Sequence, residues 1–81
     1  MNVDIYAAAF GRSYEFELDE ELSVETLIEE IVAAICQKEH CTVQGNLRDA
    51  LLLHDRKKRI LSRYQNVVQA EVVNGDTLTL I

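Results

Sequence analysis

Proline is absent from this chain of 81 residues, and glycine and cysteine are scarce, with three and two copies. Single glycines at Gly11, Gly45 and Gly75 cannot form the glycine-rich loops that cradle phosphates, which excludes nucleotide binding of that kind. No apolar run reaches the roughly 18–20 residues that cross a bilayer, and no secretion signal opens the chain. We therefore expect no membrane insertion and a cytoplasmic location.

The charge of the chain is mostly of one sign. Fourteen acidic residues outnumber eight basic ones, which gives a net charge of −6. This balance disfavours nonspecific binding to nucleic acid and to anionic lipid. The apolar and charged shares, 48% and 27%, are ordinary for a globular protein and argue against disorder. A chain this short has one core, so residues 1–81 are predicted to form a single domain.

The two cysteines, Cys36 and Cys41, are too few for the disulfide framework of a small secreted domain. Together with His40 and His54 they offer one conceivable zinc site. Structural zinc sites usually have two tight ligand pairs, whereas this sequence has one Cys-x4-Cys pair and scattered histidines. The favoured interpretation is two structural thiols and two solvated histidines, so we predict no metal and no other cofactor.

Residues suited to catalysis are dispersed along the sequence. A hydrolytic site needs a nucleophile, a base and an orienting group in one cleft, but the cysteines and histidines fall near a helix end and two turns. Adjacent carboxylates such as Glu20-Glu21 and Glu29-Glu30 are better explained as solvated than as convergent. We predict a protein that is not an enzyme, with no catalytic residue and no small-molecule substrate.

The first half of the chain shows two clear periodicities. Residues 2–8 and 14–18 alternate apolar with polar residues around a loop that contains Gly11, which predicts an antiparallel hairpin. Ser23 is a good helix N-cap, and Leu22 and Leu27 stand at the positions of a hydrophobic staple. Apolar residues then follow helical spacing from about residue 24 to about residue 37, while glutamates occupy the opposite side. The sequence predicts one amphipathic helix after the hairpin.

The second half shows shorter patterns. In chain order we expect an irregular segment (38–49) with a turn at 44–46, a strand (50–54), a charged turn (55–59), a short edge strand (60–61), a loop with one helical turn (62–73), a tight turn (74–76) and a final strand (77–81). The fold class is therefore α+β: a mixed sheet with one helix packed across one face. The other face is left to solvent or to a partner.

The predicted core consists of the apolar residues that share the helix-facing side of these elements. They are Val3, Ile5, Tyr14, Phe16, Leu18, Leu27, Ile31, Ile35, Leu51, Leu53, Val72, Leu78 and Leu80. If Leu51 and Leu53 point inward, Leu52 must point outward, because side chains alternate along a strand. By the same rule Thr79 and Ile81 point outward.

Three segments of the sequence resemble the ubiquitin-like β-grasp fold, with the order ββαβββ. They are the first strand, led by Met1, the start of the helix at Leu-Ser-Val-Glu-Thr-Leu (22–27), and the ending Val-Val-Asn-Gly-Asp-Thr-Leu-Thr-Leu (72–80). Within that superfamily the chain is most similar to the small YukD-like (EsaB-like) proteins of bacterial type VII secretion. This resemblance implies an accessory or regulatory role in such a system, with components of the secretion machinery as partners.

One departure from the ubiquitin pattern bears on function. Ubiquitin and the sulfur carriers of cofactor synthesis end in a flexible Gly-Gly tail that is activated by adenylation, whereas the sequence given stops at Ile81. We therefore expect neither conjugation nor sulfur carriage. A carrier whose tail is missing from this sequence is an alternative.

Two groups of residues are predicted to bind partners. The first group is Leu52, Thr79 and Ile81 on the open sheet face, with Phe10 in the hairpin loop. These positions correspond to the apolar patch with which ubiquitin binds proteins; the alternative is that they are scattered exposed apolar residues of the kind normal on a monomer. The second group is the basic turn formed by Arg56, Lys57, Lys58 and Arg59.

The basic turn has three interpretations. It can be a solvated turn, or it can contact an acidic surface of another protein or the acidic helix of a second copy, which would give a weak homodimer. The alternative is a nucleic-acid-linked regulator, which is disfavoured by the acidic net charge and the few aromatic residues. We predict a non-conjugated protein–protein interaction module.

Overall fold

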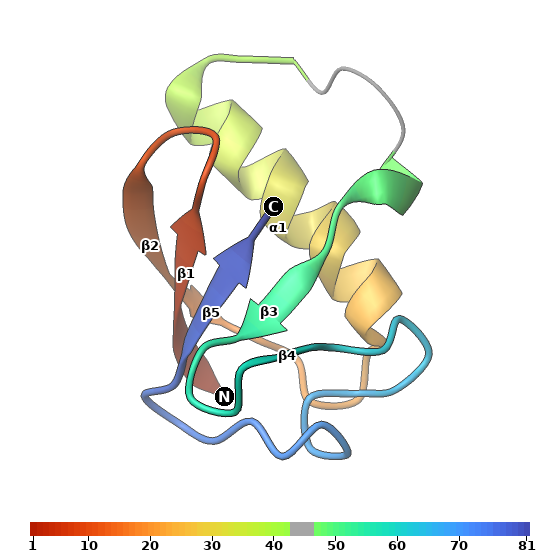
Figure 1. Cartoon of the computed structure of the whole chain (residues 1–81). Helices are drawn as coiled ribbons and strands as arrows, with labels where there is room; N and C mark the ends of the chain where they lie inside the picture. The colour runs from red at the N-terminus through yellow and green to blue at the C-terminus, as the bar shows by residue number, and fades with distance from the viewer. Residues whose placement is uncertain (43–46) are drawn as a thin grey trace.

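The structure, a computed structural model, describes residues 1–42 and 47–81. Strands β1 (Asn2–Ala7) and β2 (Arg12–Glu17) precede helix α1 (Val24–Glu39), as Figure 1 shows. A short 3-10 helix (Leu47–Asp49) then leads to β3 (Leu52–His54), β4 (Arg59–Ile60) and β5 (Thr77–Leu80). The turn predicted at 44–46 lies outside the described residues. The order of elements confirms the predicted ββαβββ arrangement.

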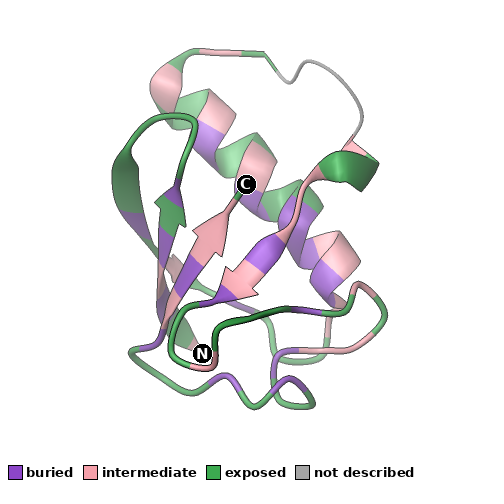
Figure 2. Ribbon diagram, in the orientation of Figure 1, coloured by how far each residue is buried: buried purple, intermediate pink, exposed green. Residues whose placement is uncertain are grey.

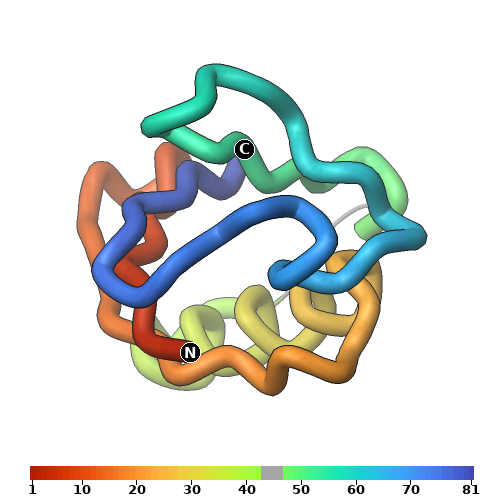
Figure 3. The backbone as a smooth tube through the Cα atoms, turned by 90° about the horizontal axis from the view of Figure 1, so that it is seen from below, coloured from red at the N-terminus to blue at the C-terminus, as the bar shows by residue number. Residues whose placement is uncertain are grey.

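The sheet is mixed and has five strands in the order β2-β1-β5-β3-β4. Strands β1 and β5 are parallel, and the other neighbouring pairs are antiparallel. Seen from below, the helix lies entirely on one side of the sheet, so the molecule has two layers (Figure 3). This confirms the α+β class with one helix across one sheet face.

Helix α1 begins and ends with local caps. The hydroxyl of Ser23 accepts a hydrogen bond from the backbone N–H of Thr26 at 3.2 Å, as expected of an N-cap. The backbone N–H groups of Val24 and Glu25 donate to carbonyls of the 61–76 loop, at 2.8 and 3.0 Å. At the other end His40 adopts the left-handed conformation, with φ +55°, and stops the helix two residues beyond the predicted end.

The core lies between the helix and the sheet. Its buried apolar residues are Val3, Ile5, Ala7, Tyr14, Leu18, Val24, Leu27, Ile28, Ile31, Ile35, Leu52, Leu61, Val67, Ala70, Val72 and Leu78. Val67, Ala70 and Val72 belong to the long loop between β4 and β5, in which one i to i−4 hydrogen bond forms the expected helical turn. This loop therefore closes the lower end of the core.

The predicted orientation of strand β3 is wrong. Leu52 is 0% exposed, whereas Leu51 and Leu53 are half-buried. The reason is the register with β5, which pairs Leu52 with Leu80 and Leu53 with Thr79. Residues paired across neighbouring strands share a face, so Leu52 joins the core and Leu53 joins the open face.

Candidate functional site

The open face of the sheet carries a row of side chains that crosses four strands. The register places Tyr6 of β1 beside Thr79 of β5, Thr79 beside Leu53 of β3, and Leu53 beside Ile60 of β4. Directly paired residues have Cβ atoms about 4.5–5.5 Å apart, so these side chains form one continuous surface. With Ile81, which follows β5, we call them the open-face patch.

Much of this patch is accessible to solvent. Tyr6 is 38% exposed, and Ile60 and Ile81 are each 54% exposed. The hydroxyl of Thr79 donates to the carboxylate of Asp55 at 2.7 Å, which leaves its methyl group free to contribute to the apolar surface. In the part of the chain that the structure describes, this is the one side-chain hydrogen bond of the open-face patch, so the patch is mostly apolar.

The patch continues into a groove at the end of the hairpin. Phe10, in the exposed turn between β1 and β2, is 40% exposed and lines a groove of about 530 Å³ together with Ile81, Leu80 and Val32. The other walls are alanines, and Figure 2 shows the hairpin turn as an exposed segment. Phe10 and Ile81, both predicted as site residues, are thus brought together.

The opposite end of the open face is acidic. Asp4 and Glu15 pair across β1 and β2, and Glu17 lies two residues further along β2. These three carboxylates line a depression of about 470 Å³ that reaches Asn2 and Gly75. The open face thus has an apolar half and an anionic half.

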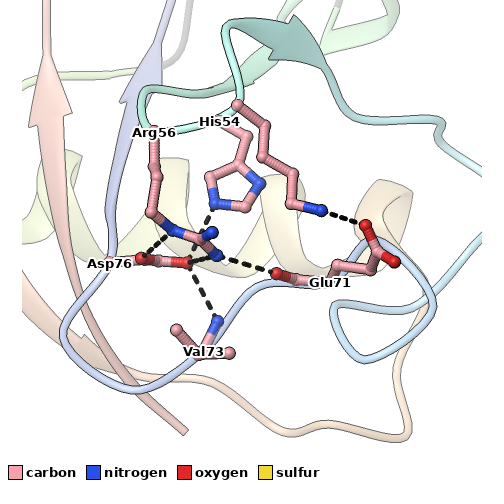
Figure 4. Close-up of polar contacts among 6 residues, drawn as sticks. His54, Arg56, Glu71, Val73 and Asp76 are labelled. Carbon is pink, nitrogen blue, oxygen red and sulfur yellow. Dashed lines mark hydrogen bonds and ion pairs between the residues drawn. The ribbon is translucent and has the colours of Figure 1, made fainter.

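A buried polar cluster fixes the turn that leads into β5 (Figure 4). Asp76, 8% exposed, accepts hydrogen bonds from the Nε2 of His54 at 2.9 Å and from the backbone N–H of Val73 at 2.9 Å. Arg56 donates two more, from Nε at 3.0 Å and Nη2 at 3.1 Å. We call this cluster the Asp76 clasp, because it ties the β3–β4 turn to the loop before β5.

The electrostatics of the Asp76 clasp follow from these contacts. The hydrogen bonds from Arg56 hold the pKa of the Asp76 carboxyl well below its usual range, in spite of its burial. Because Asp76 is ionised, His54 must present a protonated Nε2 to it. The Nδ1 atom of His54 is buried, and no group of residues 1–42 or 47–81 makes a hydrogen bond with it.

The basic turn is partly occupied by intramolecular contacts. Arg56 belongs to the Asp76 clasp, and its guanidinium also donates to the carbonyl of Glu71 at 3.2 Å. Lys57 forms an ion pair with the carboxylate of Glu71, which lowers the pKa of Glu71 through that hydrogen bond. Lys58, with φ +55°, and Arg59 of β4 are exposed. A role of this turn in partner binding stays a prediction.

A second polar cluster joins the end of α1 to β2. The hydroxyl of Tyr14 donates to the carboxylate of Glu39 at 2.6 Å, and Arg12 pairs with the same carboxylate at 3.1 Å. The hydrogen bond between Tyr14 and Glu39 raises the pKa of Tyr14 and lowers that of Glu39. The ammonium group of Lys38 lies 5.5 Å from the centre of the Tyr14 ring. These contacts secure the last turn of the helix.

The two thiols lie next to each other at the end of the helix, Cys36 in its last turn and Cys41 just after it. The backbone N–H of Cys41 donates to the carbonyl of Cys36 at 2.9 Å, and a hydrogen bond with Cys36 raises the pKa of the Cys41 thiol. Across residues 1–42 and 47–81, no three His, Cys, Asp or Glu side chains converge in a way that could hold a metal ion. In the same residues no helix is both long and apolar enough to cross a bilayer.

Of the predicted patch residues, Thr79, Ile81 and Phe10 lie where the sequence placed them, and Leu52 does not. Sequence reasoning missed Tyr6, Leu53 and Ile60. Asp55 was an available signal, because a charged residue at the end of β3 belongs on the open face, and Leu53, two residues earlier, shares that face. The three successive leucines do not alternate with polar residues, so they do not themselves show which of them faces the core.

Comparisons with known proteins agree with this geometry. Three solved structures resemble the whole chain in fold. The ubiquitin-like domain of Arabidopsis thaliana protein At2g32350 has 12% sequence identity and a TM-score of 0.73, with 74% of that chain covered. Caldiarchaeum subterraneum ubiquitin has 21% identity, a TM-score of 0.70 and 90% of that chain covered, and the N-terminal ubiquitin-like domain of the 4931431F19Rik protein has 20% identity, a TM-score of 0.71 and 72% of that chain covered. At these identities the likeness concerns the fold alone, which is the ubiquitin-like β-grasp.

The family is shown by sequence. No curated protein matches the sequence at a significant level. The family model described as "WXG100 protein secretion system (Wss), protein YukD" matches residues 1–80. Because that match spans nearly all of the sequence, the chain belongs to the YukD family of the WXG100, or type VII, secretion system.

Proposed function

We propose that the chain serves the secretion system as a non-catalytic protein-binding component, and that the open-face patch is the surface with which it binds another protein of the system. In this proposal it acts in the cytoplasm, without membrane insertion and without covalent attachment to its partner. The observation that carries the proposal is the unbroken row Tyr6–Thr79–Leu53–Ile60 on an uncovered sheet face.

The composition of the patch suits protein binding. Tyr6 presents a large ring with a polar hydroxyl, and tyrosine is among the residues that contribute most to binding energy at interfaces. Ile60 and Ile81 add aliphatic surface that loses contact with water when a partner covers it. The acidic residues Asp4, Glu15 and Glu17 lie beside the apolar half of the open face. They favour a partner that has basic residues next to its apolar contact surface.

The patch is also held rigidly. Its strands are paired on both sides at β1, β5 and β3, and the Asp76 clasp fixes the turn that leads into β5. A preformed surface loses little conformational entropy on binding, so a small apolar area can give useful affinity. In this proposal the chain has an accessory or regulatory role, because it acts by surface contact with its partner.

The experiment is a comparison of two substitutions at equally exposed residues. Ile60 of the patch and Val68 of the β4–β5 loop are both 54% exposed. We expect Ile60→Asp to reduce the recovery of secretion components in affinity capture from the source bacterium by at least about ten-fold, the effect of about 1.4 kcal/mol. Val68→Asp, the matched control, leaves recovery unchanged. Equal recovery with both variants contradicts the proposal.

The nucleic-acid alternative draws less support from the structure. Two of the four cations of the basic turn, Arg56 and Lys57, are engaged by Asp76 and Glu71. Lys58 and Arg59 alone make a small charge against a chain whose net charge is −6.

A further inference from the structure

The outer edge of strand β2 offers a second binding surface, separate from the open-face patch. Strand β2 is the first in the sheet order, so it has a neighbour on one side only (Figure 1). It is six residues long, whereas β4 at the other edge has two. Strand edges carry unpaired N–H and C=O groups that can accept a further strand.

The direction of these groups follows from the phase of the β1–β2 ladder. Met1 and Leu18 exchange both backbone hydrogen bonds, at 3.0 and 2.7 Å. In an antiparallel pair such residues alternate with residues whose N–H and C=O point away, so Phe16 and Tyr14 bond to β1. The backbone groups of Ser13, Glu15 and Glu17 therefore point outward, and no residue of 1–42 or 47–81 pairs with them.

The usual protection of such an edge is incomplete here. Natural edges are shortened, bulged, or interrupted by proline or lysine, but β2 has six residues and the sequence contains no proline. Its protection consists of Glu15 and Glu17, and neither carboxylate has an ion-pair partner in the described part of the chain. An uncovered, regular and negatively charged edge remains.

The charge on this edge selects the partner. Antiparallel pairing of β2 with β2 of a second copy would bring the glutamates of both chains together, and like charges directly opposite are destabilising. A strand with lysine or arginine opposite Glu15 and Glu17 would instead be attracted. The depression lined by Asp4, Glu15 and Glu17 leaves room for such basic side chains on the open face.

The other face of an added strand meets different surroundings. Its remaining residues would lie opposite Tyr14 and Phe16, on the side of the sheet that faces the helix. Phe16 is half-buried and packs against the core, so its outer side offers apolar contact. We infer that the β2 edge binds an extended segment of a partner protein in which basic and apolar residues alternate, so that this segment adds a sixth strand to the sheet.

The first test uses an end-blocked peptide of sequence Lys-Val-Lys-Val-Lys-Val and amide hydrogen exchange measured by NMR. We expect the peptide to slow exchange at Ser13, Glu15 and Glu17, whose N–H groups become bonded. Tyr14 and Phe16, which already donate to β1, keep their rates. The peptide Glu-Val-Glu-Val-Glu-Val gives no protection. Absence of protection at the three outward amides, or changes confined to the open-face patch, overturns the inference.

The second test separates backbone pairing from charge. Glu15→Pro removes one outward N–H and leaves the hydrogen bonds to β1 in place, which is where an edge strand tolerates proline. Its matched control is Glu15→Ala, which removes the same charge and keeps the N–H. We expect the proline variant to bind the Lys-Val peptide about five-fold more weakly than the alanine variant, the effect of one hydrogen bond.

Equal affinity of the two variants overturns strand addition. If Glu15→Pro does not fold, the exchange pattern of the unsubstituted protein decides the question alone. Ile60→Asp, which tests the open-face patch, is expected to leave peptide affinity within about two-fold, so failure at one surface is distinguishable from failure at the other.

Discussion

Removal of the Asp76 carboxylate tests how the structure holds the turn before β5. In Asp76→Ala, the Nε2–H of His54 and the N–H of Val73 lose their acceptor. His54 is fully buried, and an orphaned buried donor costs about 1–3 kcal/mol. The N–H of Val73, a residue that is 52% exposed, makes a partly buried hydrogen bond and adds a smaller cost. Arg56, whose side chain is 51% exposed, can turn to water at little cost. We therefore expect a loss of about 3 kcal/mol in the free energy of unfolding.

This loss is large for a chain of 81 residues, whose total stability is expected to be about 4–12 kcal/mol. Urea denaturation followed by circular dichroism measures it, and the melting temperature should fall by about 12–24 °C. The control is Asp55→Ala, since Asp55 is exposed and accepts one hydrogen bond from Thr79. A loss below about 1 kcal/mol in Asp76→Ala would refute the reasoning from orphaned donors.

The pH dependence gives a second check on the same residue. The pKa of Asp76 is lower in the folded state than its value of about 3.9 in an unfolded chain. Its contribution is therefore present above about pH 4 and is lost as the pH falls through the folded-state pKa. The difference in stability between the unsubstituted protein and Asp76→Asn should shrink as the pH falls below about 4.

Three further outcomes are expected. Leu52→Ala should destabilise the fold by about 2–5 kcal/mol in urea denaturation, and Leu53→Ala by less than about 1 kcal/mol, because only Leu52 is in the core; equal losses would contradict the assigned register. An NMR titration should give Tyr14 a pKa above its usual value near 10, and Glu39→Gln should lower it; an unchanged value would mean that the hydrogen bond does not persist in solution. Ser23→Ala should cost about 1 kcal/mol through loss of the N-cap, as measured by urea denaturation, and Ser23→Asp should restore most of it.

The parts of the fold that local periodicity governs were predictable from sequence. The hairpin alternates with period two, and helix α1 combines an N-cap serine with helical spacing of apolar residues, so both were predicted within a few residues of their ends. The final strand followed from its turn, where Gly75 adopts φ +86°. These elements do not need distant residues to define their pattern.

The phase of β3 and the state of the basic turn depend on distant residues. Three successive leucines do not alternate, and the face that each one occupies is decided by pairing with β5, some 26 residues later in the case of Leu53 and Thr79. Burial of His54 becomes acceptable only because Asp76 accepts its hydrogen bond. Likewise Arg56 contacts Glu71 and Asp76, which lie 15 and 20 positions later in the chain. Lys57 contacts Glu71, 14 positions later. Sequence reasoning therefore located the open face but reversed the phase of β3, which put Leu52 there in place of Leu53.

The position of β5 between β1 and β3 has a consequence for biosynthesis. While a nascent chain still lacks residues 77–80, β1 and β3 have no common neighbour, and Ile5 and Leu52 remain open to water on the helix-facing side. The hairpin and the helix can form on the ribosome, because their contacts are local. The core closes only when β5 has been made and has paired with both β1 and β3. Until β5 has been made, the apolar residues that it covers on β1 and β3 stay accessible to chaperones.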